Sequence, residues 1–457
     1  MIRGSLEQLA AAMDGAQVTR DAYFQGVFTD SRHIVPGALF VALRGETFDA
    51  HDFLGQLPGQ AVAAVVVERL PEHYPLPAIV VPDTLAALGR IGRFWRDRFA
   101  IPVIGVTGSN GKTTVKEMIA AILAAAFGEP ARLATQGNLN NEIGVPLTVV
   151  RLTDAHRAAV VELGMNHPGE IARLAAIAAP TVALVNNAQR EHQEFMHTVE
   201  AVARENGSVL AALPDDGTAV FPGDDEYTPI WRELSGARKT LTFGLDDGCD
   251  VRATWVNTGF GSDLSVRTPA GQFTVKLAAA GAHNVRNALA SIACALAAGI
   301  EIHAIVAGLE GFAPVSGRLQ RKQATNGATV IDDTYNANPD SVRAAIDVLA
   351  AYPSPRILVL GDMGEVGTQG PEFHQEIGAY ARQKGIDAVL ATGELARHMA
   401  GSGAQHHEQF DELLAALDQT LGSKSDATVL VKGSRFMKME RVVRHLTAST
   451  NTGKEAH

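Results

Sequence analysis

The sequence predicts an α/β protein of three domains, and three observations support this. The chain of 457 residues is too long for a single hydrophobic core. From residue 83 onward, apolar runs alternate with alanine-rich segments, as in mostly parallel sheets covered on both faces. The apolar run 101–106 leads into Thr-Gly-Ser-Asn-Gly-Lys-Thr-Thr over residues 107–114. That succession is typical of a strand, a phosphate-binding loop and a helix.

The first predicted unit is a small α/β N-terminal domain over residues 1–82. Apolar runs at 37–43 and 63–67 predict two of its strands. The unit ends near Pro82, and Asp83 is expected to cap a helix that connects it to the next domain.

The second predicted unit, residues 83–314, is a central domain with a parallel sheet of the P-loop ATPase type. Besides the strand before the loop, we expect strands at 158–163, 182–186, 218–221 and 240–243. A more polar, β-rich insertion at 249–277 and a helix at 284–298 should follow.

The third predicted unit, residues 315–457, repeats the alternation as a Rossmann-like α/β domain without the dinucleotide phosphate fingerprint. Its strands are expected at 329–331, 357–360, 388–391 and 429–431. The polar tail 447–457 is expected to lack a fixed fold.

Composition narrows the classes of function. A net charge of −11 disfavours general binding of nucleic acid. The only two cysteines, Cys249 and Cys294, have no metal-ligand spacing, which fits a reducing cytoplasm. No stretch has the pattern of a signal peptide or a membrane span, so we expect a cytoplasmic protein that is not inserted in a membrane. A monomer is the default expectation.

The loop at 107–114 predicts how a nucleotide would be held. Its glycines let backbone N–H groups turn toward phosphate oxygens, and Lys112 is placed for the β and γ phosphates. Thr113 suits one Mg²⁺ position. Val106 stands where the usual pattern has its first glycine, so the motif is a shorter form of the loop. The expected ATP-binding residues here are Gly108, Ser109, Asn110, Gly111, Lys112, Thr113 and Thr114.

Polar residues at the carboxyl ends of predicted strands mark a candidate site. Glu162 is a candidate Mg²⁺ ligand, with a helix cap or a surface carboxylate as the alternative. His192 could reach a second metal ion. Asn284 opens a helix and could be no more than its cap. The segment 332–341 is dense in hydrogen-bonding groups, and such loops more often bind something than merely turn.

Taken together, these motifs resemble the Mur ligase family over nearly the whole chain. The resemblance includes Thr-Asp-Ser-Arg at 29–32, Gly-Asn-Leu-Asn-Asn at 137–141, Gly-Arg at 317–318, Gly-Asp-Met-Gly-Glu at 361–365 and Val-Lys-Gly-Ser-Arg at 431–435. Tyr-Asn-Ala-Asn-Pro at 335–339 resembles the members that add the last peptide unit. It implies an ATP- and Mg²⁺-dependent ligase, with two ions expected, whose substrates are UDP-N-acetylmuramoyl-tripeptide and D-alanyl-D-alanine.

The resemblance also implies roles for individual residues. ATP would lie between the second and third units, contacted by the loop and by Asn284, Arg318 and Asp333. The catalytic set would be Lys112, Glu162, His192 and Arg318, with Thr113, Glu162 and His192 on the metal ions. Substrate would be bound by Ser31 and Arg32 at the uridine end and by Asn138 and Asn140 at the sugar-peptide portion. The third unit would receive the incoming dipeptide around Asp362, Lys432 and Arg435, and its further substrate-binding residues would be Asn336 and Asn338.

One position departs from the family. Many relatives carry a lysine, modified by CO₂ to a carbamate, 14 residues after the histidine that matches His192; this chain has Asn206 there. Because asparagine cannot form that carbamate, we predict that the modification is absent and that Asn206, Glu205 or water takes its place.

Two other classes of function remain open at this point. Folylpolyglutamate synthase is a ligase with a similar loop, although the Asp-Ser-Arg segment at 30–32 speaks against it. A kinase or nucleotide-driven switch would bind ATP without joining two substrates. A non-enzymatic binding module is less favoured, because Lys112, Glu162 and His192 together indicate a phosphate and metal site.

Overall fold

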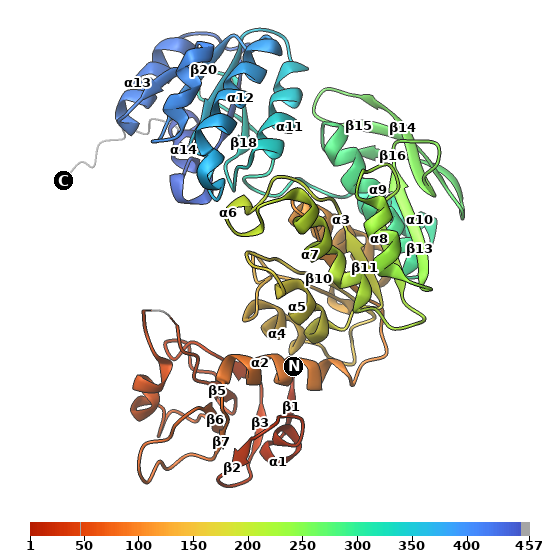
Figure 1. Cartoon of the computed structure of the whole chain (residues 1–457), viewed down its shortest axis with the longest axis vertical. Coiled ribbons are helices and arrows are strands. Elements are labelled where there is room, and N and C mark those ends of the chain that lie inside the picture. Colours follow the sequence, from red (N-terminus) through yellow and green to blue (C-terminus); the bar gives the residue numbers. More distant parts are fainter. Residues whose placement is uncertain (46, 449–457) are drawn as a thin grey trace, which may run out of the picture.

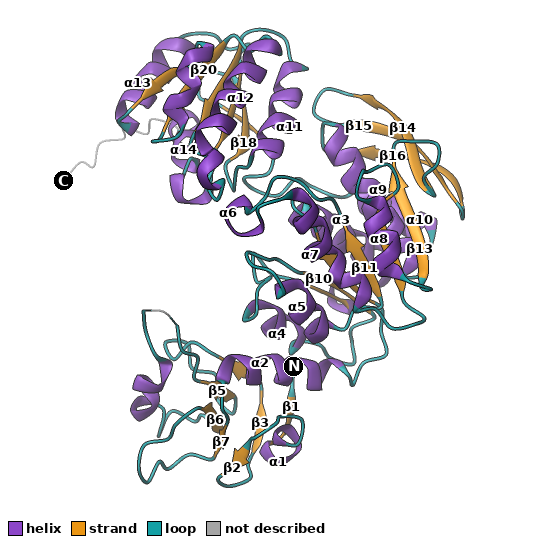
Figure 2. Ribbon diagram, viewed as in Figure 1, coloured by secondary structure: helices purple, strands orange, loops and turns teal. Residues whose placement is uncertain are grey.

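The computed structural model describes residues 1–45 and 47–448. Three sheets follow one another along the chain, each with its own helices (Figures 1 and 2). A two-stranded sheet also pairs β1 (Arg3–Ser5) with β3 (Tyr23–Gln25). The predicted α/β class is confirmed, while the domain limits near residues 82 and 314 stay predictions. No helix within the described ranges is long and apolar enough to cross a membrane.

The first sheet has five short strands in the order β2-β7-β6-β5-β4. Neighbours run parallel, except that β2 is antiparallel to β7. The elements of this region are β2 (Gln17–Val18), β4 (Val27–Phe28), β5 (Leu39–Val41), β6 (Ala64–Val67), β7 (Ala78–Val80), helix α1 (Leu6–Ala10) and the 3₁₀ helix η1 (Ala50–Gln56). Strands β5 and β6 confirm the two predicted from the sequence.

Helix α2 (Thr84–Arg96) joins the first sheet to the second and is capped by Asp83, as predicted. Oδ1 of Asp83 accepts hydrogen bonds from the N–H groups of Leu85 and Ala86, at 2.8 and 3.0 Å. A Cβ on Gly92 would lie 2.9 Å from Cβ of Pro146, so glycine permits α2 to pack closely on the central region. One continuous apolar core includes side chains from the first sheet, α2 and the central sheet.

The central sheet has nine strands in the order β16-β15-β14-β13-β12-β11-β8-β10-β9. The strands from β9 to β14 in this order are parallel, whereas β14, β15 and β16 are mutually antiparallel. The predicted polar insertion therefore forms strands that extend the same sheet. The strands are β8 (Val103–Thr107), β9 (Arg132–Ala134), β10 (Ala158–Glu162), β11 (Val182–Val185), β12 (Thr218–Pro222), β13 (Lys239–Gly244), β14 (Val251–Asn257), β15 (Ser262–Thr268) and β16 (Gly271–Leu277).

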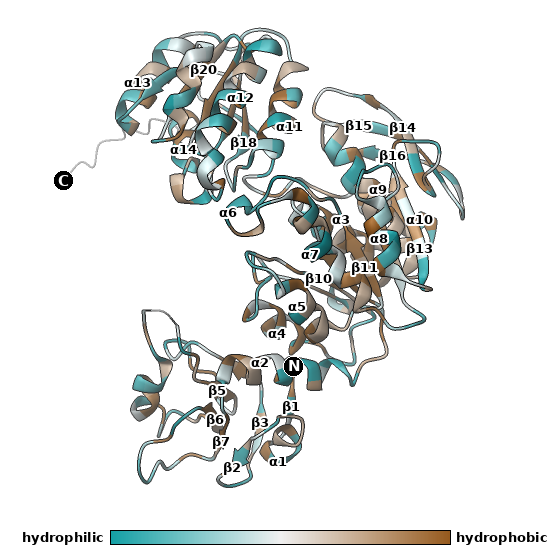
Figure 3. Cartoon of the chain, in the orientation of Figure 1, coloured by the Kyte–Doolittle hydropathy of each residue, from teal (hydrophilic) through white to brown (hydrophobic). Residues whose placement is uncertain are grey.

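Helices cover both faces of the central sheet, as predicted. Along β8, Val103 joins the core under α2, α5 and α7, and the next residue, Ile104, joins a second core under α3, α9 and α10. Figure 3 shows the apolar residues gathered in the central strands. The helices are α3 (Lys112–Phe127), α4 (Gly144–Val149), α5 (Glu170–Ala178), α6 (Gln193–Met196), α7 (Val199–Ala211), α8 (Thr228–Ser235), α9 (Ala282–Ala297) and α10 (Ile302–Glu310), with the 3₁₀ helix η2 (Glu129–Ala131).

In the central sheet, β8 lies between β10 and β11. Strands β9 and β10 lie on one side of β8, and β11, β12 and β13 lie on the other, so the strand order reverses at β8. In an open α/β sheet such a reversal leaves a crevice beyond the carboxyl ends of the strands. The 107–114 loop, Glu162 and Asn186 all lie at this edge.

The third sheet has six strands in the order β17-β18-β22-β19-β20-β21, all parallel except β17. The run β21-β20-β19-β22 has the 3-2-1-4 order of a doubly wound sheet, which agrees with the Rossmann-like prediction. Thr447, predicted to start a tail without fixed structure, instead ends helix α14; residues 449–457 lie outside the described residues. The strands are β17 (Gln320–Gln323), β18 (Thr329–Asp333), β19 (Arg356–Leu360), β20 (Ala388–Thr392), β21 (Gln405–His407) and β22 (Thr428–Lys432). The helices are α11 (Pro339–Ala350), α12 (Gly370–Gln383), α13 (Phe410–Leu421) and α14 (Glu440–Thr447), with the 3₁₀ helices η3 (Gly367–Gln369), η4 (Ala396–Ser402) and η5 (Arg435–Met437).

Candidate active site

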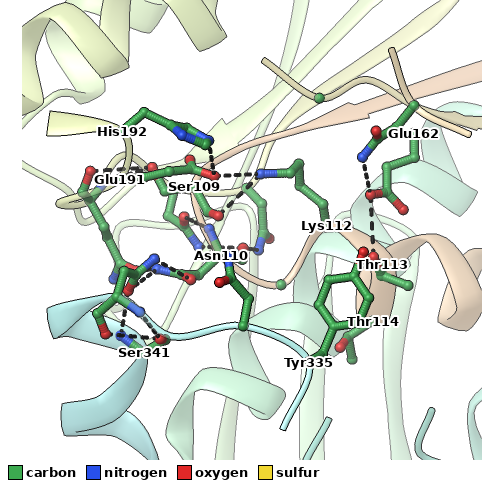
Figure 4. A pocket seen from close by; sticks show the side chains of 18 of the residues that line it. Ser109, Asn110, Lys112, Thr113, Thr114, Glu162, Glu191, His192, Tyr335 and Ser341 are labelled. Atoms are coloured by element: carbon green, nitrogen blue, oxygen red, sulfur yellow. Dashed lines mark hydrogen bonds and ion pairs between the residues drawn. The ribbon is translucent and has the colours of Figure 1, made fainter. Parts of the chain in front are cut away.

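A cavity of about 1060 Å³ is lined by residues of the central and third sheets and their loops. Most of the residues predicted from the sequence to form the site line it (Figure 4). They are Ser109, Asn110, Gly111, Lys112, Thr113, Thr114, Asn138, Asn140, Glu162, His192, Asn284, Arg318, Asp333, Asn336, Asn338, Lys432 and Arg435.

Four predicted residues do not line the cavity. Gly108 is part of the loop, and its carbonyl accepts a hydrogen bond from Lys112 Nζ. Ser31 and Arg32 belong to the first unit, and Arg32 forms an exposed two-pronged contact with Asp30, at 2.8 Å for each prong. Asp362 is buried, and its Oδ1 accepts a hydrogen bond of 2.8 Å from the Ala396 N–H. In this arrangement Asp362 holds a loop of the third unit, and its predicted role toward substrate stays a prediction.

The phosphate loop needs its glycines because other side chains crowd it. Gly108 and Gly111 have φ of 135° and 82°. A Cβ on Gly111 would lie 2.5 Å from Oδ1 of Asn287 and 2.8 Å from Nδ2 of Asn186. Asn186 also donates a hydrogen bond of 2.8 Å to the carbonyl of Asn110. Asn186, which directly follows β11, and Asn287 of α9 thus fix the shape of the loop, and α3 begins within it at Lys112.

Lys112 is the first member of a chain of charged side chains (Figure 4). Its Nζ donates to the carbonyls of Gly108 and Ser109 and lies 3.0 Å from Oε1 of Glu191. The same Glu191 oxygen lies 3.3 Å from Nε2 of His192. Nδ1 of His192 lies 2.7 Å from Oε2 of Glu365, on the third unit.

The state of His192 bears on its predicted role as a metal ligand. Burial favours the neutral ring, but the paired carboxylates of Glu191 and Glu365 outweigh it and raise the pKa of His192 to about 9. In this arrangement both ring nitrogens lie near carboxylate oxygens, which favours the protonated ring. Coordination of a metal ion would require the loss of one of its protons.

Thr113 and Glu162 are brought together with a residue of the third unit. Oε1 of Glu162 accepts hydrogen bonds from Thr113 Oγ1, at 3.2 Å, and from Asn140 Nδ2, at 2.9 Å. Nη2 of Arg318 donates to Thr113 Oγ1 at 2.9 Å, and its guanidinium lies 4.1 Å from the ring centre of Tyr335. The other oxygen of Glu162, Oε2, is buried and has no hydrogen-bond partner among the described residues. The structure therefore places Glu162 as a strand-end carboxylate with a free oxygen, not as a helix cap.

These groups fit a magnesium ion better than a metal that prefers nitrogen or sulfur. Mg²⁺ binds through one or two protein oxygens, water and substrate phosphates. The free carboxylate oxygen of Glu162 beside the hydroxyl of Thr113 supplies such ligands. Across residues 1–45 and 47–448, no cluster of three or more His, Cys, Asp or Glu side chains could hold a metal ion without other ligands.

The cavity residues of the third unit are largely paired with one another. Lys432 Nζ donates to Asp333 Oδ2 at 2.6 Å and to the carbonyl of Asn336 at 2.8 Å. Asn338 caps α11 by accepting from the Ser341 N–H at 2.8 Å, and its Nδ2 donates to Asn110 Oδ1 at 2.9 Å. The roles predicted for these residues toward substrate remain predictions.

Two further predicted residues differ in exposure. Asn284 is buried in the first turn of α9 and donates from Nδ2 to the carbonyl of Ala280 at 2.8 Å; because Gly281 is the cap, Asn284 is not. Arg435 lies at the rim with its side chain 66% exposed. Phe436 beside it is also exposed.

Asn206 stands where many members of the family carry a modified lysine. Asn206 is fully buried, and its Oδ1 accepts a hydrogen bond of 2.6 Å from Thr107 Oγ1, at the end of β8. Both carboxylate oxygens of Glu205 accept from the start of α5, from the Gly169 and Ile171 N–H groups at 2.8 and 2.9 Å. Glu205 is thereby committed to a helix terminus, which leaves Asn206 or water among the predicted substitutes.

Sequence reasoning missed the importance of residues beside His192. Arg190 donates to Asp340 and Glu376 of the third unit, with shortest distances of 2.6 and 2.7 Å, and its side chain is 23% exposed. Glu191 pairs with Lys112. The polar run directly after the buried strand β11 was the available signal, but a run of charges does not tell which side chains turn inward.

Comparisons with known proteins agree with this geometry. Residues 106–295 match the Mur ligase middle domain, and residues 317–435 match the Mur ligase glutamate ligase domain. The UDP-N-acetylmuramoyl-tripeptide–D-alanyl-D-alanine ligase of Escherichia coli is 39% identical over 450 residues, which cover 98% of this chain and 99% of the relative.

Solved structures extend the match to three dimensions. The crystal structure of MurF from Acinetobacter baumannii superposes with a TM-score of 0.91 at 35% identity, covering 98% of this chain and 99% of that one. MurF ligase from Thermotoga maritima, solved in complex with ADP, gives a TM-score of 0.83 at 27% identity over 92% and 97% of the two chains. The chain belongs to the Mur ligase family.

Proposed function

We propose that this protein is an ATP-dependent ligase that joins D-alanyl-D-alanine to UDP-N-acetylmuramoyl-tripeptide through an amide bond. The Escherichia coli relative that matches nearly the whole chain is named for this activity. The reaction is the last peptide addition to the nucleotide-linked precursor of peptidoglycan, and we place it in the cytoplasm. The working unit is a monomer without a nucleic-acid partner, in keeping with the net charge of −11.

The observation that carries the proposal is the contact between Arg318 and Thr113. It brings a cation of the third unit to the hydroxyl that follows the phosphate-loop lysine, at 2.9 Å. A triphosphate held by the loop would therefore lie between two units, with cations on both sides. The cavity of about 1060 Å³ leaves room for substrates beside the nucleotide.

The loop 107–114 would hold the phosphates of ATP through its backbone N–H groups and Lys112. Asn284 would lie beside the adenine, and Arg318 and Asp333 would contact the nucleotide from the third unit. Support for ATP comes from the loop itself and from the relative of Thermotoga maritima that was solved with ADP.

Magnesium would be held by the Thr113 hydroxyl and the Glu162 carboxylate, together with phosphate oxygens and water. When bound, it offsets the charge on the phosphate oxygens and makes the γ phosphorus a better electrophile. A second ion would draw on His192 once that ring had lost a proton.

The chain's own groups would serve two steps. The terminal carboxylate of the tripeptide attacks the γ phosphorus of ATP, and the bond from that phosphorus to the bridging oxygen breaks. ADP is released, and the tripeptide now carries an acyl phosphate. The amine of the dipeptide then attacks the acyl carbon and loses a proton, and the carbon–oxygen bond breaks to release inorganic phosphate. Lys112 and Arg318 offset the charge that gathers on the phosphoryl group, and the paired units keep water away from the acyl phosphate.

A phosphate-release assay tests the proposal. ATP turnover should require both the nucleotide-linked tripeptide and D-alanyl-D-alanine, and mass spectrometry should find the joined product. Tripeptides with lysine and with diaminopimelate at the third position should be supplied in parallel. Full ATP turnover without the dipeptide would instead indicate a kinase or a nucleotide-driven switch.

A further inference from the structure

Glu191 is a nearly buried carboxylate in the phosphate-binding region that the proposed reaction does not use. Its side chain is 11% exposed and lines the cavity. Oε1 is shared between Lys112 and His192, at 3.0 and 3.3 Å. Oε2 is buried and has no hydrogen-bond partner in the described part of the chain. A negative charge next to the lysine of a phosphate loop opposes the binding of another anion there.

The donors of Lys112 are already occupied. An ammonium group has three N–H donors. In this structure they meet the carbonyls of Gly108 and Ser109 and the carboxylate of Glu191. A phosphate oxygen can gain a hydrogen bond from Lys112 only by taking the place of one of these three acceptors. Of these three acceptors, only the Glu191 carboxylate carries a charge.

Glu191 is also held in place by its neighbours. Arg190 on one side is tied to Asp340 and Glu376, and His192 on the other side is paired with Glu365. All three partners belong to the third unit. The backbone N–H of Arg190 donates to Asp340 as well, at 2.8 Å. Because both flanking residues are anchored, the backbone at Glu191 stays near Lys112 while the two units stay together.

We propose that Glu191 is a positioning residue that competes with the β and γ phosphates of the nucleotide for Lys112. In the free enzyme it holds the lysine ammonium at the loop. When a nucleotide binds, it weakens the attraction of Lys112 for the phosphates, and it draws the lysine back as ADP leaves. The inference rests on the proposed function, since it takes ATP as the ligand of the loop.

The test is to change the charge of Glu191 without changing its shape. Glu191→Gln should bind AMP-PNP and ADP about fivefold to tenfold more tightly than the wild type in isothermal titration calorimetry with Mg²⁺. AMP lacks the β and γ phosphates, so its affinity should not change. In steady-state kinetics the KM for ATP should fall and kcat should not rise, because ADP is released more slowly. A side chain with a merely structural role would not tighten nucleotide binding.

Glu194→Gln is a matched control. Glu194 lies three residues further on and is exposed, so its neutralisation changes the net charge equally but leaves Lys112 untouched. Its AMP-PNP affinity should equal that of the wild type. Glu191→Asp keeps the charge and should stay close to the wild type, whereas Glu191→Ala should bind as tightly as Glu191→Gln. Glu191→Ala takes over the test if the glutamine variant proves unstable by thermal melting.

The outcomes separate the two ideas. Unchanged or weaker AMP-PNP binding by folded Glu191→Gln and Glu191→Ala would overturn the inference. Tighter binding by Glu194→Gln as well would also overturn it, because the effect would then be one of net charge. A wild-type enzyme that binds no AMP-PNP would refute the proposed function itself.

Discussion

The central and third sheets both end buried strands in charged side chains, yet the two sets of side chains are satisfied differently. At the end of β10, Glu162 keeps one carboxylate oxygen without a hydrogen-bond partner in the described ranges. At the end of β22, Lys432 gives its ammonium to Asp333 and Asn336. Burying a polar group costs folding free energy unless the group is hydrogen-bonded or paired with a charge. A carboxylate with one unpaired oxygen can therefore bind a cation from solution. A fully paired lysine has its partner within the fold.

The difference teaches that a charge at a strand end has two possible uses. In the central sheet it is directed at ligand, and its removal should cost activity more than stability. In the third sheet it joins strands and loops to each other, and its removal should cost stability first. Three substitutions test this division, and a fourth tests a buried neutral side chain of the third unit.

Lys112→Ala should have the largest effect. We expect phosphate release to fall by about a thousandfold or more, because the γ-phosphoryl group loses a cation aimed at its developing charge. The melting temperature should change little, since the ammonium contacts loop carbonyls and Glu191 without joining two sheets. Retained activity would remove Lys112 from the mechanism and blur the contrast with Lys432.

Lys432→Met should mainly reduce stability. Removing one member of a buried pair leaves Asp333 uncompensated, and we expect the free energy of unfolding to fall by about 3 kcal/mol. Urea unfolding of the single variant and of Lys432→Met with Asp333→Leu measures this, and the double variant should regain part of the loss. If Lys432→Met keeps its stability but loses dipeptide binding, the third sheet also directs charges at ligand.

Glu162→Ala should raise the Mg²⁺ concentration needed for half-maximal activity by about tenfold to a hundredfold, because one oxygen ligand is lost. A magnesium titration of phosphate release measures the shift, with Glu170→Ala as a control. Glu170 also lines the cavity, but its carboxylate accepts hydrogen bonds from the N–H groups of Asn166 and His167. An unaltered titration for Glu162→Ala would refute its assignment.

His374 offers the smallest effect, a dependence of stability on pH within the third unit. Burial lowers the pKa of His374 from 6.5; its Nε2 accepts from the Met363 N–H at 3.0 Å, and Nδ1 donates to the Gly370 carbonyl. Because the folded pKa is depressed, the contribution of the neutral ring is complete above pH 6.5 and is lost as pH falls below it. Melting temperatures from pH 8 to pH 5 should drop more for the wild type than for His374→Gln. Parallel curves would show that the ring contributes nothing to the pH dependence.

Much of the fold could be predicted because many of its strands and helices have clear local sequence patterns. The apolar strand before 107–114 and the glycines of the loop need no distant partner to be recognised. The polar strands at 251–277 were harder to place, since their alternating pattern does not say which sheet they join.

The site could be predicted by position but not by pairing. Glu162, Lys112 and Arg318 meet at one cavity as expected. What the sequence could not indicate was that Asp362 would turn to Ala396, or that Glu191 would reach Lys112. These outcomes depend on side-chain directions in loops from different sheets, and local sequence does not determine them.

The shared core around α2 has a consequence for dissecting the molecule. Apolar side chains from the first sheet, α2 and the central sheet form one cluster. The third unit is attached by hydrogen bonds and ion pairs at the phosphate loop and by a smaller apolar contact, in which Phe260 packs against Tyr352. Cutting the chain near residue 82 would expose apolar surface on both fragments, and we expect both fragments to aggregate. A cut near residue 314 should expose less apolar surface, and raised salt should weaken the ion pairs that attach the third unit.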